Sequence, residues 1–239
     1  MKFRGVRLLL ASVFFAGLHT QAQDTDLSAR VKVVRDGSTA QIQHEENVVV
    51  WLRPVDSQIA TRPAPTGTLR LTQHNKSFEP HVLVVPVGAV VEFPNRDPFF
   101  HNVFSLFDGK RFDLGLYEAG STRNVSFDRP GISYIFCNIH AEMSAVVIAL
   151  DTPYFAISNR RGEIVIPRVP TGRYILHVWY ESALPPTLKA LTREINVTTD
   201  SSTLGVLQIP AERTIHAHKN KYGMDYEPPP PSGSGYEHP

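Results

Sequence analysis

The sequence predicts an all-β protein built from β-sandwiches. Segments rich in β-branched and aromatic residues recur along the chain, and Gly, Pro, Asn or Asp separates them. Helical periodicity is scarce: only ALPPTLKALTREI (183–195) approaches it, and two prolines interrupt that stretch. The strand-like segments cover residues 30–37, 47–55, 67–73, 80–95, 120–137, 144–150, 162–180 and 193–199.

The N-terminus has the pattern of a secretory signal peptide. Lys2, Arg4 and Arg7 precede an apolar run over residues 8–18, followed by small and polar residues, so residues 1–22 are expected to be cleaved after Ala22. An uncleaved anchor is the alternative, but the run is shorter than the roughly 20 residues that span a bilayer. We expect a periplasmic or secreted protein with no membrane span after cleavage.

Charge and cysteine content narrow the function classes. Lys and Arg number 24 against 23 Asp and Glu, a net charge of +1. This balance lacks the excess of basic residues that would indicate a nucleic-acid partner, and we expect none. Cys137 is the only cysteine, so an exported chain cannot use it in an internal disulfide. The thiol is therefore buried and inert, kept for an intermolecular bond, or bound to a metal.

Composition divides the chain into blocks. A Pro- and Thr-rich stretch (59–68) and a seam near residues 149–155 delimit a central block, residues 66–150, of the size of one sandwich. The flanks, residues 28–58 and 152–210, supply further strands. From residue 211 to 239 the chain contains four consecutive prolines followed by Gly and Ser, which predicts a disordered tail.

The second flank carries a motif of its own. GEIVIPRVPTGRYILHV (162–178) resembles the transthyretin-like, immunoglobulin-like β-sandwich found beside carboxypeptidases as a regulatory domain. That resemblance implies that residues 28–58 supply the first strands of a smaller sandwich, split by insertion of the central block. The alternative is that residues 28–58 add strands to the central block.

One short loop concentrates potential metal ligands. In the strand GISYIFC (131–137), Ser133, Ile135 and Cys137 share a face, and Cys137 ends the strand. The next strand begins near residue 144, so Cys137, His140 and Met143 fall in or beside one loop. Thiolate, imidazole and thioether together favour copper, because zinc seldom takes a thioether.

A trigonal copper site with an axial Met requires a second histidine. His101 follows an apolar strand that breaks at PNRDP (94–98), so it can lie at the same sandwich edge as Cys137. Asn102, next to it, can hydrogen-bond the neighbouring backbone and hold the two ligand segments in register.

The order F-P-N-x-D-x-x-x-H-N followed by P-G-x-x-Y-x-F-C-x-x-H-x-x-M resembles the cupredoxins, the small blue-copper proteins, over about residues 67–150. The short C-x-x-H-x-x-M loop is similar to that of amicyanin rather than to longer plastocyanin loops. Bacterial methylamine-utilisation-like and plastocyanin-like proteins are also similar. The resemblance implies a Greek-key β-sandwich and one type 1 copper, with His101, Cys137 and His140 in the plane and Met143 axial.

Four protein ligands leave no position for a substrate, so we expect no enzyme but a carrier of single electrons. The resemblance implies that electrons pass through the exposed edge of His140, within a patch of Pro98, Phe99, Phe100 and Ala141. The expected donor and acceptor are redox proteins that bind weakly and transiently. Copper storage or delivery with the same ligands is the main alternative; a thiol enzyme and a copper fold without metal are the others.

Overall fold

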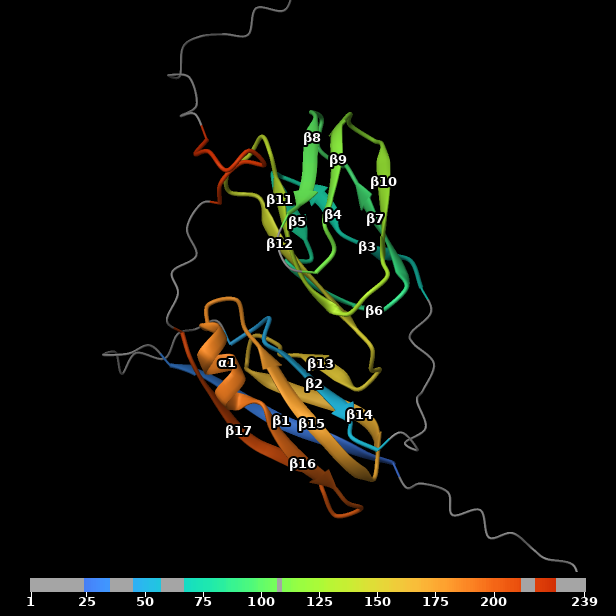
Figure 1. The fold of residues 1–239 in the computed structure, drawn as a ribbon, viewed down its shortest axis with the longest axis vertical. Helices are drawn as coiled ribbons and strands as arrows, with labels where there is room; N and C mark the ends of the chain where they lie inside the picture. The colour runs from blue at the N-terminus through green and yellow to red at the C-terminus, as the bar shows by residue number, and fades with distance from the viewer. Residues whose placement is uncertain (1–23, 35–44, 57–66, 107–108, 212–217, 227–239) are drawn as a thin grey trace, which may run out of the picture.

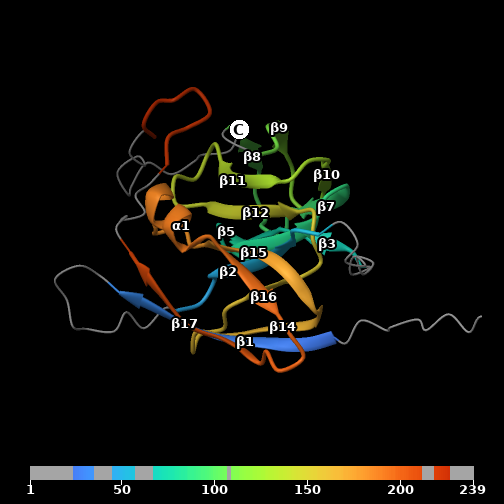
Figure 2. The same cartoon turned by 60° about the horizontal axis from the view of Figure 1, so that its bottom comes forward.

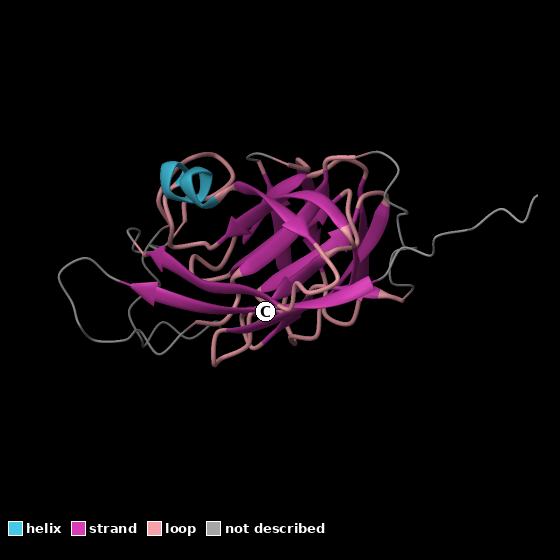
Figure 3. Ribbon diagram, turned by 90° about the horizontal axis from the view of Figure 1, so that it is seen from below, coloured by secondary structure: helices cyan, strands magenta, loops and turns pink. Residues whose placement is uncertain are grey.

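The computed structural model describes residues 24–34, 45–56, 67–106, 109–211 and 218–226 (Figure 1). The expected signal peptide, the stretch 59–66 and the Pro-rich end from residue 227 lie outside these ranges. Almost every described element is a β-strand, so the all-β prediction is confirmed (Figure 3).

The central block forms its own pair of sheets. A five-stranded sheet has the order β6-β12-β11-β8-β9, a three-stranded sheet has the order β10-β7-β3, and a hairpin joins β4 to β5. The parallel pairs of β6 with β12 and of β3 with β7 require connections that cross over instead of tight hairpins. The strands are β3 (Leu69–Arg70), β4 (Thr72–His74), β5 (Ser77–Glu79), β6 (Val82–Pro86), β7 (Ala89–Pro94), β8 (His101–Ser105), β9 (Phe112–Tyr117), β10 (Thr122–Phe127), β11 (Gly131–Cys137) and β12 (Ser144–Leu150).

Strands from both flanks share two further sheets, with orders β14-β1-β17 and β13-β2-β15-β16. The N-terminal strands β1 and β2 therefore pair with the C-terminal flank and with no strand of the central block among the described pairs. The strands are β1 (Asp24–Val34), β2 (Val49–Pro54), β13 (Phe155–Ile157), β14 (Glu163–Pro170), β15 (Gly172–Trp179), β16 (Arg193–Val197) and β17 (Thr203–Pro210).

The sheets lie in successive layers (Figure 2). The sheet containing β2 and β15 lies between the β1 sheet and the five-stranded central sheet. A cluster of buried apolar side chains that includes Val49 and Trp179 from one side and Val146 and Ile148 from the other joins the two sandwiches. The five-stranded sheet of the central block therefore packs, through β6 and β12, against the sheet containing β2 and β15.

The single described helix, α1 (Pro185–Leu191), is only seven residues long and begins at the two prolines. Proline is tolerated in the first helical turn, where its missing N–H would have no intrahelical partner. The prolines therefore start this helix instead of interrupting it.

Strand β11 shows why the sequence places Cys137 inward. Burial alternates along it: Ser133, Ile135 and Cys137 are buried, and the residues between them are partly exposed. Because successive side chains of a strand point to opposite faces, Cys137 faces the same interior as Ile135. Its side chain belongs to the core cluster of the central sandwich, together with Met143.

Candidate metal centre

Two neighbouring antiparallel strands bring the ligand segments together. Strand β8 begins at His101 and strand β11 ends at Cys137, and the two strands are paired with Cys137 opposite Val103. In an antiparallel pair the start of one strand lies at the end of its partner. The pairing of β8 with β11 thus brings together His101 and Cys137, which are 36 positions apart in the sequence.

The donor atoms converge on one point. The Sγ atom of Cys137 lies 3.6 Å from Nδ1 of His101 and 3.5 Å from Nδ1 of His140. The three donor atoms lie within 4.8 Å of one another, and within the described ranges no other such group of His, Cys, Asp and Glu is found. His101 and Cys137 are buried, and His140 is partly exposed.

Asp97 fixes the orientation of the His101 ring. Its Oδ2 atom lies 2.8 Å from Nε2 of His101, which leaves Nδ1 facing the thiol. The same carboxylate accepts hydrogen bonds from the amides of Asn75, at 2.6 Å, and Lys76, at 3.0 Å. Both residues have positive φ, 52° and 53°, in the turn between β4 and β5. Asp97 thus ties a distant hairpin to the candidate ligand.

The hydrogen bonds also set the charge of this carboxylate. Burial alone raises the pKa of Asp97, but the amides of Lys76 and Asn75 and the contact with His101 outweigh it, so the pKa lies below its ordinary value. Asp97 is therefore ionised at neutral pH and accepts a hydrogen bond from the Nε2–H group of His101. Apart from the position of Asp97 in the PNRDP motif, no sequence pattern indicates this role.

His140 contributes a neutral imidazole from the partly exposed side of the cluster. Burial, and then the nearby His101 and Lys76, lower the pKa of His140. A neutral imidazole is the form that binds a metal. The ring of Phe99 lies 5.3 Å from the ring of His101 and 5.5 Å from that of His140, so it packs over both.

The ligand loop is closed by its own backbone. The amide of Cys137 donates to the carbonyl of Met143 at 3.2 Å, and the amide of Met143 donates to the carbonyl of His140 at 3.1 Å. Met143 is 1% exposed and packs in the same core cluster as Cys137. These bonds hold the backbone of Met143 next to that of Cys137; its role as an axial ligand stays a prediction.

Asn102 differs in detail from the expectation. Its main-chain carbonyl accepts a hydrogen bond from the amide of Asn138 at 2.8 Å, and this bond joins the two ligand segments. Its side chain instead donates to Asp113 at 2.7 Å. The link that the sequence predicts between the segments is therefore present, but the backbone of Asn102 makes it.

Of the four residues expected around His140, Phe99 is the one with a described contact to the His140 ring. Phe100 is 52% exposed, Pro98 is exposed, and Phe99 and Ala141 are partly exposed. Phe99 is the one whose ring packs against the histidines, and Lys76 lies over it with Nζ 5.6 Å from the ring centroid.

The prediction of a disordered tail is wrong for residues 218–226. This segment lies beside the loop that joins β11 to β12 (Figure 1). The hydroxyl of Tyr226 donates to the carbonyl of Cys137, and the amide of Lys221 donates to Oδ1 of Asn138 at 2.9 Å. The ring of His218 lies 4.3 Å from that of Phe136. The composition of the tail does not indicate that Tyr226, Lys221 and His218 make these contacts.

The donor set fits copper. The bond lengths of zinc, about 2.3 Å to sulfur and 2.0 Å to nitrogen, place the two donors about 3.5 Å apart at a tetrahedral angle, so the spacing of Cys137 with both histidines, 3.6 and 3.5 Å, suits a metal ion of this size. Two imidazoles, one thiolate and a thioether form the set that copper prefers over zinc.

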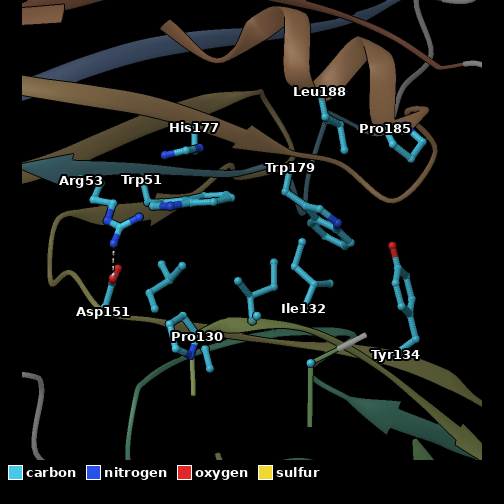
Figure 4. A pocket seen from close by; sticks show the side chains of 15 residues that line it. Trp51, Arg53, Pro130, Ile132, Tyr134, Asp151, His177, Trp179, Pro185 and Leu188 are labelled. Atoms are coloured by element: carbon cyan, nitrogen blue, oxygen red, sulfur yellow. Dashed lines mark ion pairs between the residues drawn. The ribbon is translucent and has the colours of Figure 1, made fainter. Parts of the chain in front are cut away.

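A cavity of about 480 Å³ lies elsewhere, where the two sandwiches meet (Figure 4). Trp51, stacked on His177 at 5.0 Å, and Trp179 line it, and an ion pair of Arg53 with Asp151, 3.3 Å long, lies at its side. None of the four candidate ligands lines this cavity. Within the described ranges no helix has the length and hydrophobicity that a membrane span requires.

The solved structures to which the chain is similar are cupredoxins, as the sequence predicts. A purple cupredoxin from Nitrosopumilus maritimus is 21% identical, with 34% of this chain and 99% of that chain covered and a TM-score of 0.32. A Cu(I) amicyanin variant is 16% identical, with 42% and 98% covered and a TM-score of 0.34. No protein-family model and no curated protein matches the chain.

A copper-containing nitrite reductase from Thermus scotoductus SA-01 is 22% identical; 49% of this chain is covered but only 28% of that chain, with a TM-score of 0.34. The matches therefore include an enzyme and do not separate carriers from enzymes. Scores this low carry no inference about the metal, which rests on the side chains described above. The resemblance of the flanking strands to a transthyretin-like sandwich stays a prediction.

Proposed function

We propose that the chain is an exported carrier of single electrons that holds one type 1 copper between His101, Cys137, His140 and Met143. The observation that supports this most strongly is the convergence of two Nδ1 atoms on one buried thiol, at 3.5 and 3.6 Å, in a chain with no other cysteine. Bound copper would supply a one-electron Cu(I)/Cu(II) couple.

The residues around the site support electron transfer over other chemistry. Cys137 and Met143 are buried, His101 is held through Asp97, and the loop is closed by backbone hydrogen bonds. Ligands that are fixed before the metal binds need little rearrangement when its charge changes. Four protein ligands also leave no open position for a substrate, which distinguishes this arrangement from a catalytic metal site.

The partly exposed His140 is the proposed route for electrons. Phe99 packs on its ring, and Phe100 and Pro98, its neighbours in the sequence, are exposed apolar residues. A small apolar contact suits a redox partner that must bind and leave quickly. We propose a periplasmic or secreted location on the basis of the N-terminal sequence.

Copper delivery or storage is the second candidate, because the same four ligands could pass on their metal. Repeated reduction and reoxidation of the copper-loaded protein in the presence of excess Cu(I) chelator separates the two functions. A carrier retains its copper through the cycles and shows a reversible couple, whereas a delivery protein loses the metal on reduction. His101→Ala and Cys137→Ser are the controls that remove the site.

A further inference from the structure

Residues 218–226, here called the C-terminal strap, have a shape fixed by their own hydrogen bonds. The side-chain oxygen of Asn220 accepts from the amides of Tyr222, at 3.0 Å, and Met224, at 3.1 Å. The backbone of Asn220 also bonds that of Met224 and Gly223, at 2.9 Å each. A segment closed on itself in this way can present side chains in a defined direction.

Those side chains are directed at the ligand loop. The Tyr226 hydroxyl bonds the carbonyl of Cys137, the Lys221 amide bonds Asn138, and the His218 ring packs on Phe136. The strap therefore contacts three consecutive residues, the candidate thiolate ligand Cys137 and its two neighbours in the sequence. The His218 ring also packs edge-on against Tyr226, with centroids 5.2 Å apart, which supports the tyrosine in its position.

The strap also reaches the segment that carries His101. The ammonium group of Lys221 lies 2.8 Å from Oδ2 of Asp113, and Oδ1 of Asp113 accepts from the side chain of Asn102 at 2.7 Å. Burial raises the pKa of Asp113, but the hydrogen bonds from Lys221 and Asn102 outweigh it and lower the net pKa, so the carboxylate is charged. One lysine thus connects the strap to both ligand segments.

We propose that the C-terminal strap holds the ligand loop closed and slows release of the bound metal, with Tyr226 and Lys221 as positioning residues. This inference rests on the proposed function. Release requires the Cys137–Met143 loop to move away from His101, and the described loop is otherwise closed by a few backbone hydrogen bonds. The strap adds bonds that must break in the same movement. His140 stays partly exposed with the strap in place, so the proposed electron path remains open.

The test measures the rate at which the copper-loaded full chain loses copper to an excess of Cu(I) chelator. Tyr226→Phe removes one hydroxyl, and we expect release to be about 3- to 10-fold faster, the effect of one hydrogen bond. Deletion of residues 218–239 is expected to speed release at least about 30-fold, because it removes two hydrogen bonds to Cys137 and Asn138, the Lys221–Asp113 ion pair and an aromatic contact. Release from both variants within twofold of the wild-type rate would overturn the proposal.

Two controls isolate the strap. Tyr222→Phe makes the same chemical change at a side chain that is 70% exposed, and deletion of residues 227–239 keeps Tyr226 while removing the Pro-rich end. We expect both to release copper at the wild-type rate. Equal acceleration by Tyr222→Phe and Tyr226→Phe would show a general weakening of the segment and would contradict the role of the Cys137 contact.

A second measurement needs no metal, so it separates failure of the strap from failure of the proposed function. In the metal-free chain, the amides of residues 138–143 are expected to exchange with solvent deuterium about 3- to 10-fold faster in Tyr226→Phe than in the wild type. If the wild type binds no copper but the exchange rates still differ between the wild type and Tyr226→Phe, the proposed electron carrier is refuted and the role of the strap in closing the loop is supported. Unchanged exchange in both Tyr226→Phe and the deletion would refute the strap.

Discussion

Replacement of Asp97 by Asn tests how strongly the outer hydrogen bonds control the metal centre. The carboxylate accepts from three donors: the amides of Asn75 and Lys76 and Nε2 of His101, at 2.6, 3.0 and 2.8 Å. An amide side chain offers one oxygen and one NH₂ group, so at least one buried donor would face another donor. Each donor that loses its acceptor costs about 1–3 kcal/mol.

Two assays follow from that loss. Copper affinity, measured by competition with a chelator, is expected to fall about 10- to 100-fold, because the partner that orients a histidine ligand is removed. The unfolding free energy of the metal-free chain, measured in urea, is expected to fall by about 1–3 kcal/mol. Asp128→Asn is the matched control, since the Asp128 side chain is 62% exposed and pairs with Lys110, away from the candidate ligands. Affinity within threefold of the wild type in Asp97→Asn would refute this reasoning.

Further predictions concern other parts of the fold. His81 forms a hydrogen bond with Glu181 at 2.6 Å, which raises the His81 pKa. The pair stabilises the folded chain fully below pH 6.5, the ordinary pKa of histidine, and this stabilisation is lost as the pH rises through the raised pKa of the folded chain. Urea unfolding at pH 6 and pH 9 should show this loss in the wild type and less of it in Glu181→Gln. Phe100→Ala should slow electron exchange with a redox partner without changing the copper spectrum, whereas Leu116→Ala, at a residue that is also exposed, should change neither the exchange rate nor the spectrum. Equal exchange rates in Phe100→Ala and the wild type would exclude a role of Phe100 in electron entry. Ile135→Ala should cost about 2–5 kcal/mol in the same unfolding assay, because Ile135 is fully buried, and a loss below 1 kcal/mol would contradict its place in the core.

Local sequence was sufficient to predict the ligand loop. Alternation in β11 and the break after Cys137 fix where the strand ends, and His140 and Met143 follow within six residues. The approach of His101 was also predictable, because β8 begins after a run of turn residues and any strand start at that edge lies near the end of an antiparallel neighbour.

The contacts around the loop were not predictable in the same way. Asp97 meets Asn75 and Lys76 across 21 or 22 residues, and Tyr226 meets Cys137 across 89 residues. No periodicity links such positions, since each pairing depends on the finished tertiary arrangement. Composition was misleading at the C-terminus because the Pro-rich end follows directly after the strap, whose own residues include Tyr, Lys and His side chains.

The central claim is that Cys137 binds copper together with His101 and His140. Titration of the metal-free chain with Cu(II), followed by visible absorption and electron paramagnetic resonance, tests it most directly. We predict an intense thiolate-to-copper absorption band that saturates at one copper per chain and is absent in Cys137→Ser. A protein that stays colourless, or that binds zinc in preference to copper at these residues, would contradict the claim.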